Sequence, residues 1–290
     1  MWQLPDDQFV RSFPTLPRIA VLKSQNQFPR EDRVVFVEDG HAYFVDGIRV
    51  PRSVTGLVHY FAHHFDPARA VRSMKQGRNW DEKLAEMEDL GLGTSDEEII
   101  SRWRRHGEAQ SKRGQLLHHH AELLLNGLEI EEPHSPEFMQ LRSIYQSLLM
   151  LGLRPHRTEL CIFHVGLRLA GQIDALFLDE DWKLVIVDWK RIRDLKYENT
   201  YSSLLYPLDH LPDTNYWTYA LQLNMYRYIL ETEYGLDVSR MMLAIVHPDM
   251  TSPRLVDVPR LDDEVRAIHD FEIEHGRADM SACLETVFSV

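Results

Sequence analysis

The segment Gly171–Lys190 reads GQIDALFLDEDWKLVIVDWK. Two apolar stretches separated by the polar run DEDWK predict two short β-strands joined by a turn. Side chains alternate between the faces of a strand, so Asp188 and Lys190 are expected to project from the same face of the second strand. Their neighbours on that face are Leu184 and Ile186, and the opposite face carries Val185, Val187 and Trp189. Charged groups in such an apolar hairpin are costly unless they are paired or bind a cation.

The register of this hairpin decides what its acidic residues can do. A turn near Asp181 places Asp174 opposite Asp188, and a slip of one residue would separate them. Two converging carboxylates either share a proton or hold a divalent cation. A buried salt bridge between Lys190 and either aspartate accounts for the same residues. The hairpin alone therefore leaves a metal site and a salt bridge open.

The composition indicates a globular chain with a sizeable core. The chain has 290 residues, of which 44% are hydrophobic. We predict one compact unit in which residues 1–100, an elaboration with a leader, a hairpin and helices, pack on a core of residues 101–290. Cys161 and Cys283 lie far apart, which predicts neither a disulfide framework nor a four-cysteine cage. The lack of a long apolar run or a secretory start predicts an intracellular protein that is neither secreted nor membrane-spanning.

The net charge of −13 is unfavourable for a nucleic-acid partner, because phosphate contacts normally recruit basic residues. The charge is uneven, however, and a locally basic cleft on an acidic body remains consistent with the sequence. Solvated helix faces explain the same clusters. The two basic clusters are Arg102, Arg104, Arg105, Lys112 and Arg113, and Lys190, Arg191, Arg193 and Lys196.

The order of the predicted elements indicates the fold class. After an irregular leader to about Arg30, helices precede a block of strands, and helix and strand then alternate. This order predicts an α/β fold with a central mixed sheet flanked by helices. The predicted strands are a hairpin over 33–50 and strands over 159–165, 167–178, 184–190, 241–247 and 255–258. The predicted helices start after Ser53 or Thr55 and cover 67–75, 96–125 as one or two helices, 133–151, 216–234 and 262–275.

Two helices carry polar residues four positions apart, which places them on one helix face. Gly114, His118 and Glu122 share a face of the helix before the strands, and Gln222 and Tyr226 share a face of the helix after them. A lone histidine or an aromatic stripe is more often structural than functional. These pairs gain weight only from the motifs to which they belong.

Three motifs together resemble those of the PD-(D/E)xK nuclease superfamily. The arrangement GQID at 171–174 and IVDWK at 186–190 looks like the superfamily signature. GQLLHHHAE at 114–122 resembles the G-x-x-x-H-x-x-x-E helix of its RecB-like exonuclease branch, and QLNMY at 222–226 resembles that branch's Q-x-x-x-Y motif. The motifs occur in the family's order over roughly residues 103–230.

This resemblance implies a restriction-endonuclease-like core and a set of site residues. His118, Asp174 and Asp188 would be ligands of Mg²⁺, or alternatively Mn²⁺, with the Trp189 carbonyl completing the coordination. The catalytic set would be Lys190, Asp188, Asp174, Gln222 and Tyr226, and Glu159 and Glu122 would be auxiliary residues. Separately from the resemblance, the uneven charge leads us to expect that DNA contacts Arg105, Lys112, Arg113, Arg191 and Arg193.

The departures from the family are informative. No four-cysteine set is present, so no iron–sulfur cluster is expected, and the chain is similar to cluster-free relatives such as the mitochondrial genome maintenance exonuclease and viral exonucleases. The segment PRSVT at 51–55 also resembles the entry segment of those relatives. No G-x-x-x-x-G-K-[ST] loop occurs, so unwinding would need a helicase or another replication or recombination partner.

The function that we expect is a divalent-metal-dependent DNA exonuclease, preferring single strands or free ends, in DNA repair, replication or recombination. One alternative is a structure-specific or nicking endonuclease on the same scaffold. The other is a catalytically inactive nucleic-acid-binding protein. The complete set of one histidine, two aspartates and one lysine favours catalysis.

Overall fold

A computed structural model describes residues 21–130 and 134–287 of the chain. The described residues fall into two compact units, one of residues 64–116 and the other of residues 21–63, 117–130 and 134–287. This division differs from the predicted boundary at residue 100, because the N-terminal hairpin belongs to the same unit as the strands of the core. Of the predicted leader, residues 1–20 lie outside the described part.

The unit of residues 64–116 is built from α3 (Pro67–Lys75), α4 (Trp80–Asp89) and the first part of α5 (Asp96–Leu125). Asp66 caps α3 by accepting a hydrogen bond from Arg69 N. Ser95 and Glu98 form a reciprocal capping box at the start of α5. A small core of Val71, Met87 and Ile99 holds the three helices together. The segment 96–125, which was predicted as one or two helices, forms a single helix of 30 residues.

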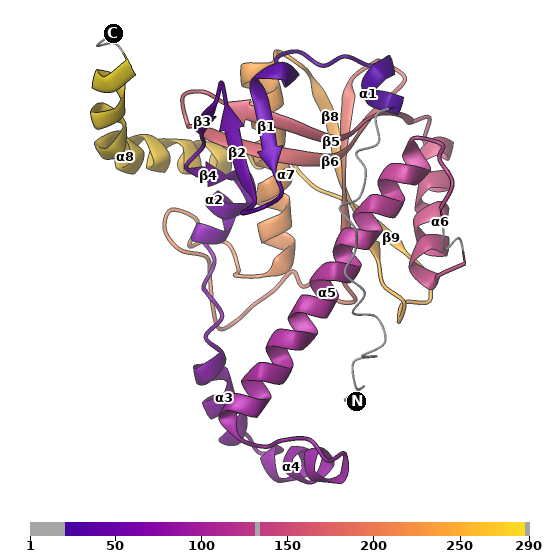
Figure 1. The fold of residues 1–290 in the computed structure, drawn as a ribbon, viewed down its shortest axis with the longest axis vertical. Coiled ribbons are helices and arrows are strands. Elements are labelled where there is room, and N and C mark those ends of the chain that lie inside the picture. Colours follow the sequence, from indigo (N-terminus) through magenta and orange to yellow (C-terminus); the bar gives the residue numbers. More distant parts are fainter. Residues whose placement is uncertain (1–20, 131–133, 288–290) are drawn as a thin grey trace. The chain divides into compact units, whose positions relative to one another are not determined.

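The other unit contains two sheets (Figure 1). The strands β1 (Val34–Val37), β2 (Ala42–Val45) and β3 (Ile48–Arg49) form an antiparallel sheet. A six-stranded mixed sheet runs in the order β4-β6-β7-β8-β9, with β5 also paired to β6. Its strands are β4 (Arg52–Ser53), β5 (Arg154–His164), β6 (Leu169–Leu178), β7 (Leu184–Arg191), β8 (Val238–Val246) and β9 (Arg254–Asp257). The predicted mixed sheet with an antiparallel component is confirmed.

Helices cover both faces of this sheet and explain why β7 is apolar on both sides. One core cluster joins Leu184 and Ile186 to α2 (Val54–Tyr60), α7 (Asn215–Glu233) and α8 (Asp262–Val287). A second cluster joins Val185, Val187 and Trp189 to α6 (Pro136–Met150) and the last turns of α5. Ser53, rather than Thr55, caps α2. Within the described ranges, no helix combines the length and apolarity needed to cross a bilayer.

The predicted irregular structure up to about Arg30 is wrong for one short stretch, α1 (Val21–Gln25), and a 3₁₀ turn at Glu31–Arg33 follows just beyond the predicted leader. The cause is tertiary. Leu22 is buried in the second cluster, and its N–H donates to the Asn126 side chain at the end of α5. Such a contact over 104 residues is not visible in local sequence.

The hairpin register is the predicted one for the four pairs from Ala175↔Val187 to Leu178↔Leu184. The side chains of β6, however, do not alternate regularly between the two faces of the sheet, because the alternation reverses at Asp174. Leu169 and Ile173, at odd-numbered positions, lie in the first core cluster, and beyond Asp174 the even-numbered Leu176 lies in the same cluster. On β5, opposite this point, Glu159 has a φ of 48°, the left-handed region that side chains rarely adopt. The sheet is thus irregular where both strands carry an acidic residue.

Candidate active site

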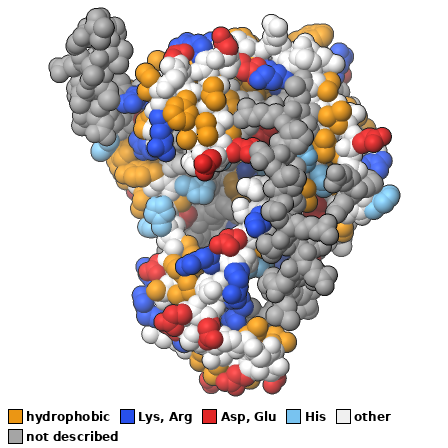
Figure 2. Space-filling view, viewed as in Figure 1, with side chains coloured by type: hydrophobic (Ala, Val, Ile, Leu, Met, Phe, Trp, Pro, Cys, Tyr) orange, Lys and Arg blue, Asp and Glu red, His pale blue; other side chains and the backbone are white. Residues whose placement is uncertain are grey.

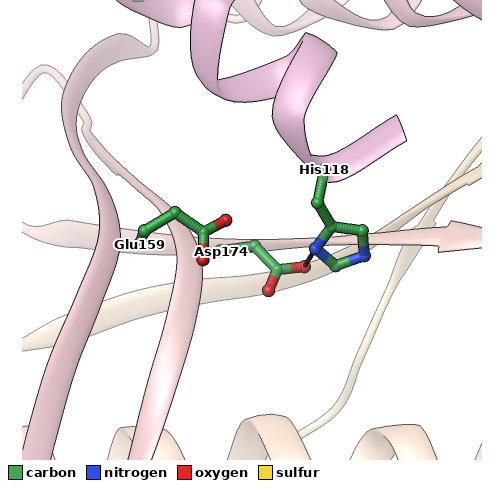
Figure 3. Close-up of side chains that lie close together, drawn as sticks. All are labelled: His118, Glu159 and Asp174. Atoms are coloured by element: carbon green, nitrogen blue, oxygen red, sulfur yellow. Dashed lines mark ion pairs between the residues drawn. The ribbon is translucent and has the colours of Figure 1, made fainter. Parts of the chain in front are cut away.

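Three side chains converge at this irregularity (Figure 3). His118 comes from α5, Glu159 from β5 and Asp174 from β6. One potential ligand atom from each lies within 4.8 Å of the others, and His118 Nδ1 lies 3.4 Å from Asp174 Oδ2. We call these residues the candidate triad. All three belong to the same compact unit.

The backbone explains how each member is held. Leu117, Ala121 and Leu125 anchor the end of α5 in the second core cluster, which fixes the turn that bears His118. Asp174 Oδ2 accepts a hydrogen bond of 2.9 Å from the backbone N–H of Trp189. The left-handed backbone of Glu159 costs about 1–3 kcal/mol, and such strain is concentrated at functional sites.

The candidate triad is electrostatically crowded. Burial, reinforced by the charge of Asp174, raises the pKa of Glu159 to about 8. Burial alone would lower the pKa of His118, but the charge of Asp174, its hydrogen bond to the imidazole and the charge of Glu159 together outweigh burial and raise that pKa to about 9. For Asp174, burial is outweighed by His118, Lys190 and the Trp189 N–H, so its pKa lies below the ordinary value. A cation placed among these groups would relieve the repulsion between the two carboxylates.

Lys190 and Asp188 form a second feature beside the triad. Lys190 Nζ lies 2.7 Å from Asp188 Oδ2, and the lysine side chain is 16% exposed. Burial raises the pKa of Asp188 to about 6, against the opposing effect of Lys190. The lysine ammonium also sits 4.7 Å from the centre of the Tyr219 ring, a cation–π contact. Burial alone would lower the pKa of Lys190, but the charges of Asp188 and Asp174 together outweigh burial and hold that pKa above its ordinary value.

Gln222 and Tyr226 lie on one face of α7 and contact each other. Gln222 Nε2 donates to the Tyr226 hydroxyl at 2.9 Å and lies 3.2 Å from the Thr55 hydroxyl of α2. Tyr226 packs against Gly171, where an added Cβ would lie 2.6 Å from Tyr226 Cε1. The glycine of the GQID segment therefore permits the tyrosine to reach the sheet beside Asp174. The charges of Asp174 and Asp188 add to burial in raising the pKa of Tyr226 well above its ordinary value.

The structure groups the predicted site residues differently from the predicted ligand set. Glu159, predicted as auxiliary, joins His118 and Asp174, whereas Asp188 pairs with Lys190. The regular alternation of side chains along a strand could not predict this grouping, because the alternation of β6 reverses at Asp174 and Glu159 has a left-handed backbone. Three contacts were not predicted: Thr55 with Gln222, Tyr219 with Lys190 and Gly171 with Tyr226. The sequence did single out the SVT segment at 53–55, which contains Thr55, but it did not predict the contact of Thr55 with Gln222.

The remaining predicted residues have varied surroundings. The Trp189 ring is buried in the second core cluster. Glu122 on α5 is partly exposed, and its charge contributes to raising the pKa of Glu159. His120 is buried and packs edge-on against Phe138.

The predicted DNA-binding residues also differ in exposure. The Arg191 side chain is only 3% exposed and pairs with Glu137 of α6, so its guanidinium serves the fold. Arg193 is exposed and pairs with Asp194. Arg105, Lys112 and Arg113 are exposed on α5 in the unit of residues 64–116. On the face drawn in Figure 2, acidic and basic side chains are interspersed.

With this geometry established, comparison with known proteins gives the class. The model of the PD-(D/E)XK nuclease superfamily matches residues 95–283, which is more than half of the chain. The chain therefore belongs to the PD-(D/E)XK nuclease superfamily, and the resemblance of the sequence motifs is confirmed at that level. Its restriction-endonuclease-like fold agrees with the mixed sheet described above.

Two solved structures are similar to this chain. A "Putative exonuclease" from Eubacterium rectale is 17% identical, with a TM-score of 0.34 over 57% of this chain and 65% of its own. The protein SSO0001 is 15% identical, with a TM-score of 0.29 over 77% of this chain and 74% of its own. This chain thus spans 65% of the length of the Eubacterium rectale protein. No curated protein matches the chain.

Nucleases of this superfamily use divalent metals, and the candidate triad fits such an ion. One imidazole and two carboxylates offer donor atoms within 4.8 Å of one another. Carboxylate oxygens suit hard divalent cations such as Mg²⁺ and Mn²⁺, and imidazole is acceptable to several divalent metals. Beside them, the buried Asp188 Oδ2 lies 2.7 Å from Lys190 Nζ. The donor set of the candidate triad thus has the chemistry that a divalent cation requires.

Proposed function

We propose that this protein is a divalent-metal-dependent DNA exonuclease of the RecB-like branch, acting on single strands or free ends. The observation that carries the proposal is the convergence of His118, Glu159 and Asp174 beside the Lys190–Asp188 pair in a member of a nuclease superfamily. Three separate motifs contribute to this one region, which a purely structural salt bridge does not explain.

In this proposal the candidate triad holds Mg²⁺ or Mn²⁺. Asp188 and the Trp189 carbonyl are further candidate ligands next to it. A divalent cation held there would neutralise the negative charge that develops on the phosphoryl oxygens during hydrolysis.

The other residues position the substrate and handle protons. Lys190, kept protonated by Asp188 and Asp174, offers a cation to the phosphate and to the transition state. Gln222 and the Tyr226 hydroxyl offer hydrogen bonds to a phosphate oxygen from α7. Asp188 keeps the ammonium in place through the ion pair.

The experiment that tests the proposal is a time course on end-labelled DNA. Single-stranded and duplex substrates are incubated with Mg²⁺, Mn²⁺ or EDTA, and products are separated by length. We expect metal-dependent release of short products from single strands. The absence of any metal-dependent product would refute catalysis and favour a nucleic-acid-binding protein.

A circular single strand separates the two enzymatic alternatives. An obligate exonuclease leaves the circle intact and degrades the same strand after linearisation. Cleavage of the circle would identify an endonuclease on this scaffold. DNA and RNA of the same sequence, compared in parallel, test the substrate class, and added helicase tests whether duplex degradation needs a partner.

A further inference from the structure

A polar cavity lies at the start of α7, in the same unit as the candidate triad. Its volume is about 660 Å³, and α7 and the preceding loop form its walls. The lining residues are Lys196, Glu198, Asn199, Thr200, Tyr201, Asp213, Thr214, Asn215 and Thr218. No residue of the catalytic proposal lines it.

The loop is fastened to the helix by specific hydrogen bonds. Asn215 Oδ1 accepts from Lys196 N at 2.8 Å, and Asn215 Nδ2 donates to the carbonyl of Asp194. Asn199 Nδ2 donates to the carbonyl of Asp213 at 2.9 Å. The cavity is therefore a constructed feature of the fold.

Thr214 is the unusual member of the lining. It occupies the N-cap of α7, where a threonine hydroxyl ordinarily accepts a hydrogen bond from the first turn. Here the side chain forms no capping bond; the residue is only 7% exposed, and its Oγ1 is buried without a partner among the described residues. The first-turn N–H groups of Asn215 and Trp217 have no acceptor within the helix either. Thr214 and Asn215, which both line the cavity, thus place donors at one wall, whereas Trp217 does not line it.

The charge and the aromatic content of the lining indicate the ligand. Lys196 is opposed by Glu198 and Asp213, so the lining carries one more acidic than basic side chain and repels a free phosphate dianion more strongly than a monoanion. A monoanionic phosphodiester, held by the helix N-terminus and the Thr214 hydroxyl, suits it better. Tyr201 is 98% exposed, and an exposed ring at the edge of a polar cavity provides a stacking surface for a base.

The cavity is adjacent to the catalytic region along α7. Thr218, Gln222 and Tyr226 of α7 are spaced four residues apart, so each lies on the same side of the helix as the next. Thr218 lines the cavity, whereas Gln222 contacts Tyr226. The step from one to the other is four residues, or about 6 Å along the helix axis.

We propose that this cavity binds a nucleotide of single-stranded DNA next to the scissile phosphate, with its phosphodiester at the start of α7 and its base on Tyr201. The proposal rests on the proposed function and deepens it. It assigns the recognition of a single strand to the loop before α7.

The test compares Tyr201→Ala and Thr214→Val with the wild-type protein. Binding of a fluorescein-labelled oligothymidylate is followed by anisotropy in EDTA, and KM and kcat are measured separately with Mg²⁺. Losing one stacked base should weaken binding about 5-fold to 100-fold, and losing one hydrogen bond about 2-fold to 10-fold. KM should rise accordingly while kcat stays nearly unchanged.

Matched variants control for indirect effects. Trp182→Ala removes another exposed aromatic ring, at the β6–β7 turn, and Thr232→Val removes a hydroxyl near the other end of α7. Both should bind like the wild type. Inorganic phosphate should not displace the oligonucleotide. Its displacement at low concentration would identify a free-phosphate site and overturn the proposal.

The outcomes distinguish this inference from the proposed function. Normal cleavage with unchanged binding and KM in both cavity variants would refute the subsite and leave the nuclease intact. A wild-type protein that neither binds nor cleaves single-stranded DNA would refute both. Because Tyr201 is exposed and valine is close in shape to threonine, a folding defect does not explain a loss of binding; circular dichroism verifies this.

Discussion

Glu159→Gln is expected to stabilise the metal-free protein while abolishing its activity. Burial and the charge of Asp174 raise the pKa of Glu159 from 4.5 to about 8. Between these pH values the folded chain keeps a proton that the unfolded chain releases, so the stability contributed by this group falls as pH rises. Glutamine preserves the shape and removes the ionisation.

The magnitude follows from the size of the shift. A pH of about 7 is about 2.5 units above the pKa of this carboxyl in the unfolded chain. At about 1.4 kcal/mol per unit, keeping the carboxyl protonated in the folded chain lowers the free energy of unfolding by about 3 kcal/mol. Glu159 is partly exposed, and solvent screening reduces this. We therefore expect Glu159→Gln to raise the free energy of unfolding by about 1–2 kcal/mol at about pH 7, and by almost nothing near about pH 4.5.

The assay is urea denaturation followed by tryptophan fluorescence in EDTA at both pH values. Glu180→Gln, at an exposed position of the β6–β7 turn, is the matched control and should change nothing. A Glu159→Gln protein less stable than wild type near neutral pH, or a difference independent of pH, would refute the reasoning. The carboxylate would then be ionised and satisfied by His118 without any metal.

Three further predictions follow from the same site. Gly171→Ala places a Cβ 2.6 Å from Tyr226 Cε1, so it should destabilise the fold by about 1–3 kcal/mol in denaturation; an unchanged midpoint would contradict the close packing. Lys190→Ala should lower the cleavage rate by at least about 100-fold with an unchanged circular dichroism spectrum, since the carboxylate it pairs with can take up a proton; full activity would remove the lysine from the mechanism. With pKa values of about 9 for His118 and about 8 for Glu159, both groups hold a proton near neutral pH until a metal displaces it. Calorimetric titration with Mn²⁺ at about pH 7 should therefore show release of about two protons, and heats that do not depend on the buffer would contradict this.

The local sequence was sufficient where the relevant contacts are close along the chain. The Gly171–Lys190 segment predicted its own strands, turn and register, because alternating apolar residues specify which way each side chain points. Ser53, one of the two candidate caps, likewise marked the start of α2, and α3 begins at the predicted residue 67. The three motifs gave the superfamily that the family model confirms.

Tertiary structure decided the details of the site. Glu159 reaches His118 and Asp174 only because its backbone is left-handed and the alternation of β6 reverses opposite it, and neither feature follows from residue type. Arg191 is an internal ion-pair partner because α6 places Glu137 against it. The sequence by itself therefore determined the fold class and which strands carry acidic groups, because these depend on periodicity. Which of those groups converge depends on irregular backbone and on contacts between distant elements, and only the folded chain contains that information.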